Sequence, residues 1–350
     1  MKKERVFYLD FIRAVAAISI IITHYNARFL YMDPVPYKKM IITSEIGGIY
    51  IGAWGVSLFF IISGAALMYV YQDAIDLKVF YKKRFLNIYP MFWLAYFAAL
   101  LLLFVLNRGI VFPDVPKYRF LFTLLGIDGW LSQIMGTFYI LGEWFLGVII
   151  MLYIFFPLLR KGLIKAPKVT ALFAFTLYIG LIFFFGNGIK GIALDTIILS
   201  RVPEILFGMW FIKERRKVSI SAALIGLAIV VANSFLKPST IPQMYQITYV
   251  GISSYIVLIY VASIVERFRI VDWFVSLISK YSYAIFLVHH VIIEKIRSRF
   301  DLAALSAFKS YILFLAICLF IAIFSGLLYK AHDVMMKIIK DNFLQRSKTV

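Results

Sequence analysis

The stretch YLDFIRAVAAISIIITHY at residues 8–25 decides the fold, because it sets Asp10, Arg13 and His24 inside a long apolar run. A helix that crosses a bilayer needs roughly 20 mostly apolar residues, and this stretch with its neighbours supplies them. Arg13 and His24 are eleven residues apart, so a turn of 100° per residue places them about 20° apart around one helix. The first predicted helix therefore carries a polar stripe along an otherwise apolar surface.

The composition agrees with a membrane environment for the whole chain. Of its 350 residues, 63% are hydrophobic and 16% are charged, whereas soluble proteins have about half and a quarter. A mean hydropathy of +0.89 indicates a helical protein that crosses the membrane many times. The net charge of +19 would suit a nucleic-acid binder, but the apolar excess excludes that class. The single cysteine, Cys318, excludes a disulfide framework and a zinc cage.

The apolar runs predict an all-α polytopic membrane protein with about ten transmembrane helices in one domain, residues 1–350. The predicted spans are about 7–29, 49–71, 87–106, 134–158, 169–186, 192–212, 218–235, 244–265, 271–293 and 309–330. The run at 120–125 is too short to cross and is interpreted as an interfacial or re-entrant piece. Most of the 37 Lys and Arg residues then fall on the side of the N-terminus, which predicts an N-in, C-in orientation. The first span lacks a cleavage pattern and is interpreted as an uncleaved helix.

Ionisable side chains within the spans are the first candidates for a site, because a charge at a helix centre costs roughly 2.5–3.5 kcal/mol. Asp10 can pair with Arg13 three residues later. In the ninth span His289 should reach the depth of His24, and two imidazoles from different helices can then face one cavity. The alternative is that Asp10 and Arg13 snorkel at the inner interface and His24 is a satisfied bundle residue. His290 is interpreted as an interfacial polar residue.

Three further segments contain candidate residues, two of them with a structural alternative. A basic cluster with Lys83 and Arg84 enters the third span just before Tyr89 and Pro90; it suits phosphate, or it is a positive-inside anchor. Arg201 lies within the sixth span beside a proline and Glu204, and the pair suits a site or structural glue. Glu143 is expected in the outer part of the bilayer.

Together these segments resemble acyltransferase family 3, the membrane-bound O-acyltransferases that modify surface polysaccharides. Arg13 and His24 match the family's Arg-x10-His spacing, and GVSLFFIISG at residues 55–64 is similar to its second-span motif. The basic entry with Tyr89-Pro90 and the segment SYAIFLVH at residues 282–289 are also similar. The order of the motifs, from Tyr8 to about His290, makes the resemblance specific.

Two positions depart from the family pattern. Many members have a second arginine where this chain has Asn87, and a glutamate where it has Ile149. The second departure is typical of the subgroup without a fused extracytoplasmic SGNH domain.

The resemblance implies an O-acyltransferase that moves an acetyl or other acyl group from cytoplasmic acetyl-CoA to a sugar hydroxyl, without a metal. The acceptor would be a surface glycan or its lipid-linked precursor, and the location a bacterial plasma membrane. His24 would act as general base or transient acyl carrier. Arg13, Arg84, Lys83 and Tyr89 would bind the donor; His289, Ser63, Arg201 and Glu143 would serve the acceptor side or the developing charge. The alternative is a polysaccharide or lipid-linked sugar exporter, whose polar stripe lines a path without acyl transfer.

Overall fold

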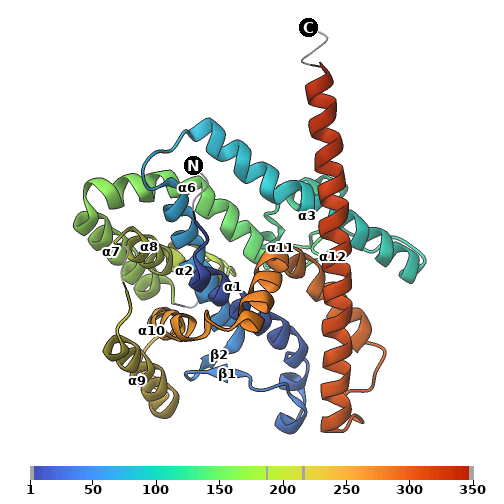
Figure 1. Cartoon of the computed structure of the whole chain (residues 1–350). Coiled ribbons are helices and arrows are strands. Elements are labelled where there is room, and N and C mark those ends of the chain that lie inside the picture. Colours follow the sequence, from blue (N-terminus) through green and yellow to red (C-terminus); the bar gives the residue numbers. More distant parts are fainter. Residues whose placement is uncertain (1–3, 187, 215–216, 347–350) are drawn as a thin grey trace.

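The computed structural model describes residues 4–186, 188–214 and 217–346, and these are almost entirely helical (Figure 1). The two strands among them, β1 (Glu45–Ile46) and β2 (Ile49–Tyr50), pair antiparallel as a small hairpin. Gly47 and Gly48 join them with φ of 60° and 74°, the left-handed backbone that a tight two-residue turn requires. The all-α prediction is confirmed.

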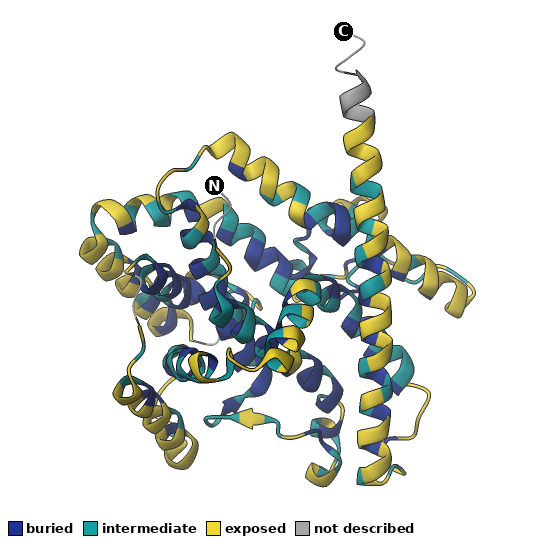
Figure 2. Cartoon of the chain, viewed as in Figure 1, coloured by how far each residue is buried: buried dark blue, intermediate teal, exposed yellow. Residues whose placement is uncertain are grey.

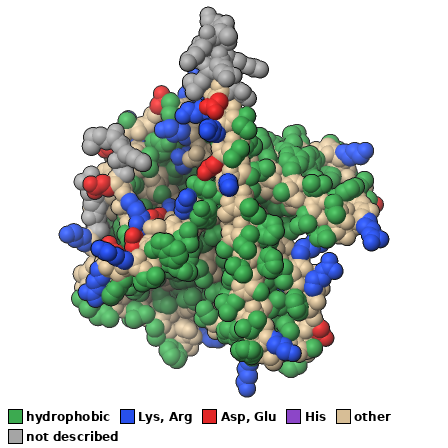
Figure 3. All heavy atoms as spheres, turned by 45° about the vertical axis from the view of Figure 1, so that its right-hand side comes forward, with side chains coloured by type: hydrophobic (Ala, Val, Ile, Leu, Met, Phe, Trp, Pro, Cys, Tyr) green, Lys and Arg blue, Asp and Glu red, His purple; other side chains and the backbone are tan. Residues whose placement is uncertain are grey.

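Each of the ten predicted spans contains one helix. The helices are α1 (Phe7–Asn26), α2 (Ile51–Tyr71), α3 (Leu77–Asn107), α6 (Trp144–Lys165), α7 (Pro167–Phe185), α8 (Ile198–Lys213), α9 (Ile220–Leu236), α10 (Gln243–Val265), α11 (Arg269–Arg297) and α12 (Ala307–Arg346). Within the described ranges, eight are long and apolar enough to cross a membrane, while α8 and α9 are shorter. The chain is a multi-pass membrane protein, and hydrophobic side chains cover most of the face shown in Figure 3.

The ends of three helices differ from the predicted spans by ten residues or more. Helix α3 begins ten residues early, because the side chain of Asp76 accepts a hydrogen bond from the backbone N–H of Val79 and caps it. Helix α6 begins ten residues late, after Gly142 with φ of 75°. Helix α12 continues to Arg346, and its 40 residues give a length of about 60 Å, twice the hydrocarbon thickness. A helix can continue beyond the hydrocarbon layer where charged residues follow its apolar part, so the end of the apolar run does not mark the end of α12.

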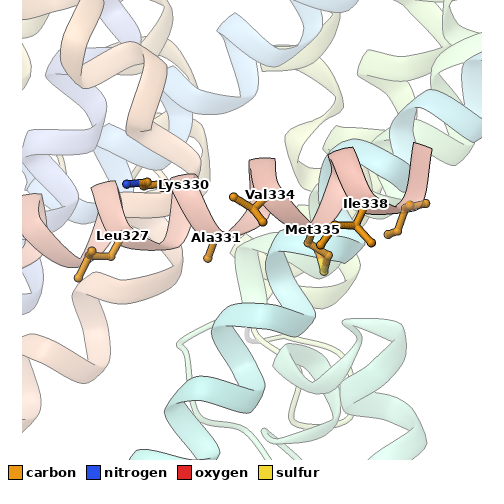
Figure 4. A pocket seen from close by; sticks show the side chains of 7 residues that line it. Leu327, Lys330, Ala331, Val334, Met335 and Ile338 are labelled. Carbon is orange, nitrogen blue, oxygen red and sulfur yellow. The ribbon is translucent and has the colours of Figure 1, made fainter. Parts of the chain in front are cut away.

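Only the C-terminal end of α12 extends beyond the rest of the bundle (Figure 1). Leu327, Ala331, Val334, Met335 and Ile338 follow one another along α12 and line a shallow groove of about 500 Å³ (Figure 4). None of these residues lines the cavity described below, so this groove is separate from the site.

Helix α2 is the centre of the bundle, whereas α7, α9 and α12 expose much of their surface (Figure 2). Helix α2 packs closely against α8 because glycines lie where the two helices cross. A Cβ atom on Gly64 would lie 2.3 Å from the carbonyl oxygen of Ile205, and one on Gly208 would lie 2.0 Å from that of Ile61. Small residues of this kind let transmembrane helices approach backbone to backbone. The motif GVSLFFIISG therefore has a packing role in this fold.

The segment between α3 and α6 turns back into the bundle. It contains α4 (Phe120–Leu125) and α5 (Asp128–Leu131). The indole N–H of Trp93 donates to the carbonyl of Leu124 (2.9 Å), and the hydroxyl of Tyr89 donates to that of Leu125 (3.0 Å). Because α3 ends at Asn107, these contacts lie roughly 20 Å back along it. The segment therefore folds back along α3, and its two α-helices, of six and four residues, are too short to span a membrane. The short 3₁₀ helices among the described residues are η1 (Phe29–Tyr31), η2 (Tyr37–Lys39), η3 (Lys117–Arg119) and η4 (Leu194–Thr196).

Candidate active site

Helices α1 and α11 lie side by side and run in the same direction. Arg5, just before α1, pairs with Asp272 in the first turn of α11 (2.6 Å), and at the last turns of both helices the guanidinium of Arg297 donates to the carbonyl of His24 (2.9 Å). The same ends of two parallel helices therefore meet. This arrangement brings the histidines of α11 to the depth of His24, as the sequence predicts.

Three imidazoles gather near the last turn of α1. The ring centroid of His24 lies 4.8 Å from that of His289 and 5.2 Å from that of His290. The rings of His289 and His290 are 6.4 Å apart. The interfacial interpretation of His290 missed this contact, because sequence alone does not fix how α11 is rotated against α1.

The hydrogen bonds of His289 define its tautomer. Its Nδ1 lies 2.7 Å from the carbonyl oxygen of Phe286 and 3.2 Å from that of Ile285. A carbonyl oxygen only accepts, so Nδ1 must carry a proton. Its Nε2 is buried and has no hydrogen-bond partner among the described residues. In the neutral ring this Nε2 has a free lone pair that can accept a proton or a hydrogen bond.

One cavity of about 850 Å³ brings together residues that lie far apart in the sequence. Six of the sequence-predicted site residues line it: Arg13, His24, Ser63, Arg84, Arg201 and His289. Asn87 and Ile149, the two departures from the family pattern, line the same cavity. Arg13 and His24 of the polar stripe on α1 therefore face an internal space.

Arg13 is held toward the cavity by a small network. Its Nη1 donates to Asp10 (3.0 Å) and to the hydroxyl of Ser279 on α11 (2.9 Å), and that hydroxyl donates to Asp10 (2.7 Å). Asp10 does not line the cavity and acts as the partner of Arg13, as the sequence predicts. Ser279 was missed, because serine carries no signal of its own in a transmembrane helix.

Arg84 lies over aromatic rings near the opposite wall. Its guanidinium carbon is 5.4 Å from the ring centroid of Tyr153 on α6 and 5.8 Å from that of Phe80. Cations are attracted to aromatic faces at such distances. The Nε of Arg84 is buried without a hydrogen-bond partner in the described part of the chain. An anion that enters the cavity can supply that partner, so the group suits a phosphate.

Arg201 is fully buried, as is Glu204 beside it. The Nη1 of Arg201 lies 3.4 Å from both carboxylate oxygens, and its Nε donates to the carbonyl of Asp195 (2.9 Å). The Nη2 has no partner among the described residues. Arg201 therefore keeps one donor unused while it lines the cavity.

Besides Asp10, three predicted residues lie away from the cavity wall. Lys83 is exposed on α3. The hydroxyl of Tyr89 donates a hydrogen bond to the carbonyl of Leu125 in the segment between α3 and α6. Glu143 is fully buried just before α6, and no side chain of the described residues donates a hydrogen bond to it. Burial raises the pKa of the Glu143 carboxyl to about 7, and the nearby carboxyl of Asp128 adds to the effect, although neighbouring backbone groups lower it. Because Glu143 is buried and does not line the cavity, it is not placed to contact an acceptor there.

Among the described residues, no group of three or more His, Cys, Asp or Glu side chains is arranged to hold a metal ion. The imidazoles that line the cavity can transfer protons, and its guanidiniums can stabilise negative charge.

Comparison with known proteins identifies one family. A family model described as an acyltransferase domain matches residues 6–330, which is nearly the whole chain. No curated protein and no solved structure matches the chain. All the cavity residues named above lie within the matched range.

Proposed function

The chain belongs to this acyltransferase family, and from that premise we propose that it is a membrane O-acetyltransferase that acts on glycans. The donor is acetyl-CoA, and the acceptor is a sugar hydroxyl of a surface polysaccharide or of its lipid-linked precursor. The family match supports acyl transfer within a membrane and speaks against an exporter without chemistry. The proposed location is a bacterial plasma membrane, with both ends of the chain on the donor side.

One observation carries the proposal. His24 and His289 lie 4.8 Å apart at one end of the cavity, and Arg13 and Arg84 line the same cavity. Since α1 is continuous from Arg13 to His24, the two residues are about 16 Å apart along its axis. Acetyl-CoA has a phosphate-rich head on a long thin arm with the thioester at its tip. A cavity in which Arg13 lies about 16 Å from the His24 imidazole suits that shape.

The donor end uses positive charge and aromatic surface. We assign the phosphates of acetyl-CoA to Arg13 and Arg84. The buried Nε of Arg84 has no hydrogen-bond partner among the described residues. Tyr153, over which Arg84 lies, offers a flat surface beside these cations. Lys83 is exposed on the same helix and would attract the anion toward the entrance without a direct contact.

The transfer itself needs a base and an anion hole. His24 takes the proton from the sugar hydroxyl as its oxygen attacks the thioester carbonyl carbon. The carbon–sulfur bond then breaks, and the leaving thiolate takes the proton back from the His24 imidazolium. The products are the O-acetyl sugar and CoA. If His24 instead carries the acetyl group transiently, its ring nitrogen attacks the thioester carbonyl carbon, the carbon–sulfur bond breaks, and the thiolate takes a proton from the acylated ring. The sugar oxygen then attacks the acyl-imidazole, the carbon–nitrogen bond breaks, and the hydroxyl proton goes to the ring nitrogen.

The remaining groups serve the acceptor and the developing charge. The free Nε2 of His289 can accept a hydrogen bond from the acceptor, with Ser63 on the same cavity wall. The unused Nη2 of Arg201 can donate to the oxyanion of the tetrahedral intermediate.

The test is acetyl transfer by purified protein in lipid nanodiscs, with radiolabelled acetyl-CoA and surface glycan from the producing cells. Wild-type protein should label the glycan, and His24→Ala should not. His332→Ala is the matched control, because His332 lies on α12 outside the cavity and its loss should leave the rate unchanged. Glycan labelling by His24→Ala at the wild-type rate would refute the assignment of the base. Label on the protein with donor alone would identify the acyl-carrier route.

A further inference from the structure

Arg297 is an arginine buried at the outer end of the histidine cluster. It lies in the last turn of α11, and only 3% of its surface is exposed. It lies outside the cavity wall, so it contacts neither substrate in the proposed reaction. The predicted span ends at residue 293, four residues before it, and no motif includes it. A buried guanidinium persists only where its hydrogen bonds are used.

Its partners are two backbone carbonyls at the end of α1. The Nη1 of Arg297 donates to the carbonyl oxygens of His24 (2.9 Å) and Tyr25 (3.1 Å). The last four carbonyls of a helix have no partner within it, so this side chain closes the last turn of α1. The residue whose carbonyl it binds is the proposed base itself.

The other side of the guanidinium is held in place as well. Its Nη2 pairs with Glu294, one turn earlier on α11, and Glu294 also lies 3.6 Å from Arg28. Arg297 is therefore fixed on α11 before it reaches across to α1. His289 is two turns earlier on α11, and His290 is next to it. One side chain thus joins the helix of His24 to the helix of its two neighbours.

We propose that Arg297 is a positioning residue that sets the His24 imidazole against His289 and His290. The inference rests on the proposed function, in which His24 is the base. Without the guanidinium, the last turn of α1 loses both bonds to α11 and His24 can rotate or shift. Misplacement of a reacting group by about 1 Å can cost on the order of 100-fold in rate.

The kinetic test compares Arg297→Gln and Arg297→Lys with wild-type protein in nanodiscs. We expect Arg297→Gln to lower kcat by about 100-fold and to leave the KM for acetyl-CoA unchanged, because the donor end lies about 16 Å away. Arg297→Lys keeps the charge and one donor to a carbonyl, so it should recover a large part of kcat. A kcat unchanged in Arg297→Gln, or a rise in KM as large as the fall in kcat, would overturn the proposal.

A matched control separates positioning from a general loss of stability. Arg160 donates to the carbonyls of Tyr71 and Gln72 at the end of α2, so Arg160→Gln removes the same kind of cap from another helix. It should lower the thermal midpoint about as much as Arg297→Gln does, with kcat at the wild-type level. An equal fall in kcat in Arg160→Gln would show that lost stability alone explains the effect.

A second readout does not need activity. Diethylpyrocarbonate modifies imidazoles, and mass spectrometry separates the peptide with His24 from the peptide with His289 and His290. In Arg297→Gln the modification rate of His24 should rise several-fold relative to the other peptide, while in Arg160→Gln the ratio should stay constant. An unchanged ratio in Arg297→Gln contradicts positioning. If wild-type protein transfers no acetyl group, the proposed function fails, and this ratio still decides whether Arg297 holds His24.

Discussion

The imidazole rings of His24 and His289 lie 4.8 Å apart, although the two residues are at opposite ends of the sequence. Parallel packing of α1 and α11, fixed by Arg5 and Asp272 at one end and by Arg297 at the other, produces this contact. Each helix contributes one wall of the same cavity.

His289→Ala should affect the use of the glycan acceptor more than the binding of acetyl-CoA. Its free Nε2 is the proposed partner of the acceptor, so we expect the KM for glycan to rise or kcat to fall by about 10-fold or more, with the KM for acetyl-CoA unchanged. Steady-state kinetics with each substrate varied in turn measures the difference. A change confined to the KM for acetyl-CoA would place the donor at this end.

Arg84→Gln should weaken donor binding. A charge-assisted hydrogen bond to a phosphate contributes about 1.5–3 kcal/mol, so the KM for acetyl-CoA should rise by about 10- to 100-fold. Lys78→Gln is the matched control, because Lys78 is an exposed cation on the same helix and does not line the cavity. Equal effects of the two changes on the KM would contradict a specific role of Arg84.

The pair Arg201 and Glu204 allows stability to be separated from function. Glu204→Ala leaves the buried guanidinium without its carboxylate and should lower stability by about 3–5 kcal/mol. Arg201→Met combined with Glu204→Met removes both charges and should be much more stable than Glu204→Ala, yet it should be inactive. Thermal unfolding in detergent and the acetyl-transfer assay measure the two effects. Acetyl transfer by the double variant would show that the reaction does not need Arg201.

Close packing of α2 on α8 predicts the effect of one added methyl group. Gly208→Ala places a Cβ atom 2.0 Å from the carbonyl oxygen of Ile61, which forces the helices apart and should cost about 1–3 kcal/mol. Gly180→Ala on α7 is the control, because nothing lies within 4 Å of its Cβ position. Unfolding temperatures in detergent compare the two. An equally stable Gly208→Ala variant would contradict the observed helix approach.

Glu143 predicts a pH dependence of stability. Its pKa is raised by burial to about 7 from an ordinary value of 4.5, so between these values the folded chain keeps a proton that the unfolded chain has lost. Stability from this group is therefore complete below about pH 4.5 and is lost as the pH rises through about 7, with a difference on the order of 3 kcal/mol. Glu143→Gln should flatten the curve of thermal midpoint against pH in that interval. A variant whose curve remains parallel to that of the wild type would exclude Glu143 as the cause.

Several residues of the cavity were predictable from sequence because they are charged or polar and lie within apolar membrane-spanning segments. Arg13, His24 and Arg201 are costly within apolar runs, and their spacing places Arg13 and His24 on one face. Contacts that depend on how two helices rotate against each other were not predictable: the approach of His290 to His24 is one, and the hydrogen bond that Arg13 donates to Ser279 is another.

Helix ends explain most of the remaining differences. Arg297 was missed because hydropathy ends the ninth span at residue 293, whereas the backbone of α11 stays helical to Arg297. Hydropathy reports the part of a helix that is apolar, and caps such as Asp76 decide where it begins. The same limit applies to Glu143, which the predicted span 134–158 includes and which precedes the first turn of α6.

The central claim is that one cavity connects a donor on one side of the membrane to an acceptor on the other, with His24 between them. The direct measurement uses proteoliposomes with acetyl-CoA sealed inside and glycan outside, and counts O-acetyl groups on the outer glycan by mass spectrometry. Wild-type vesicles should acetylate the outer glycan, and vesicles with His24→Ala should not. Acetylation that is absent with wild-type protein, or equal with His24→Ala, would contradict the account.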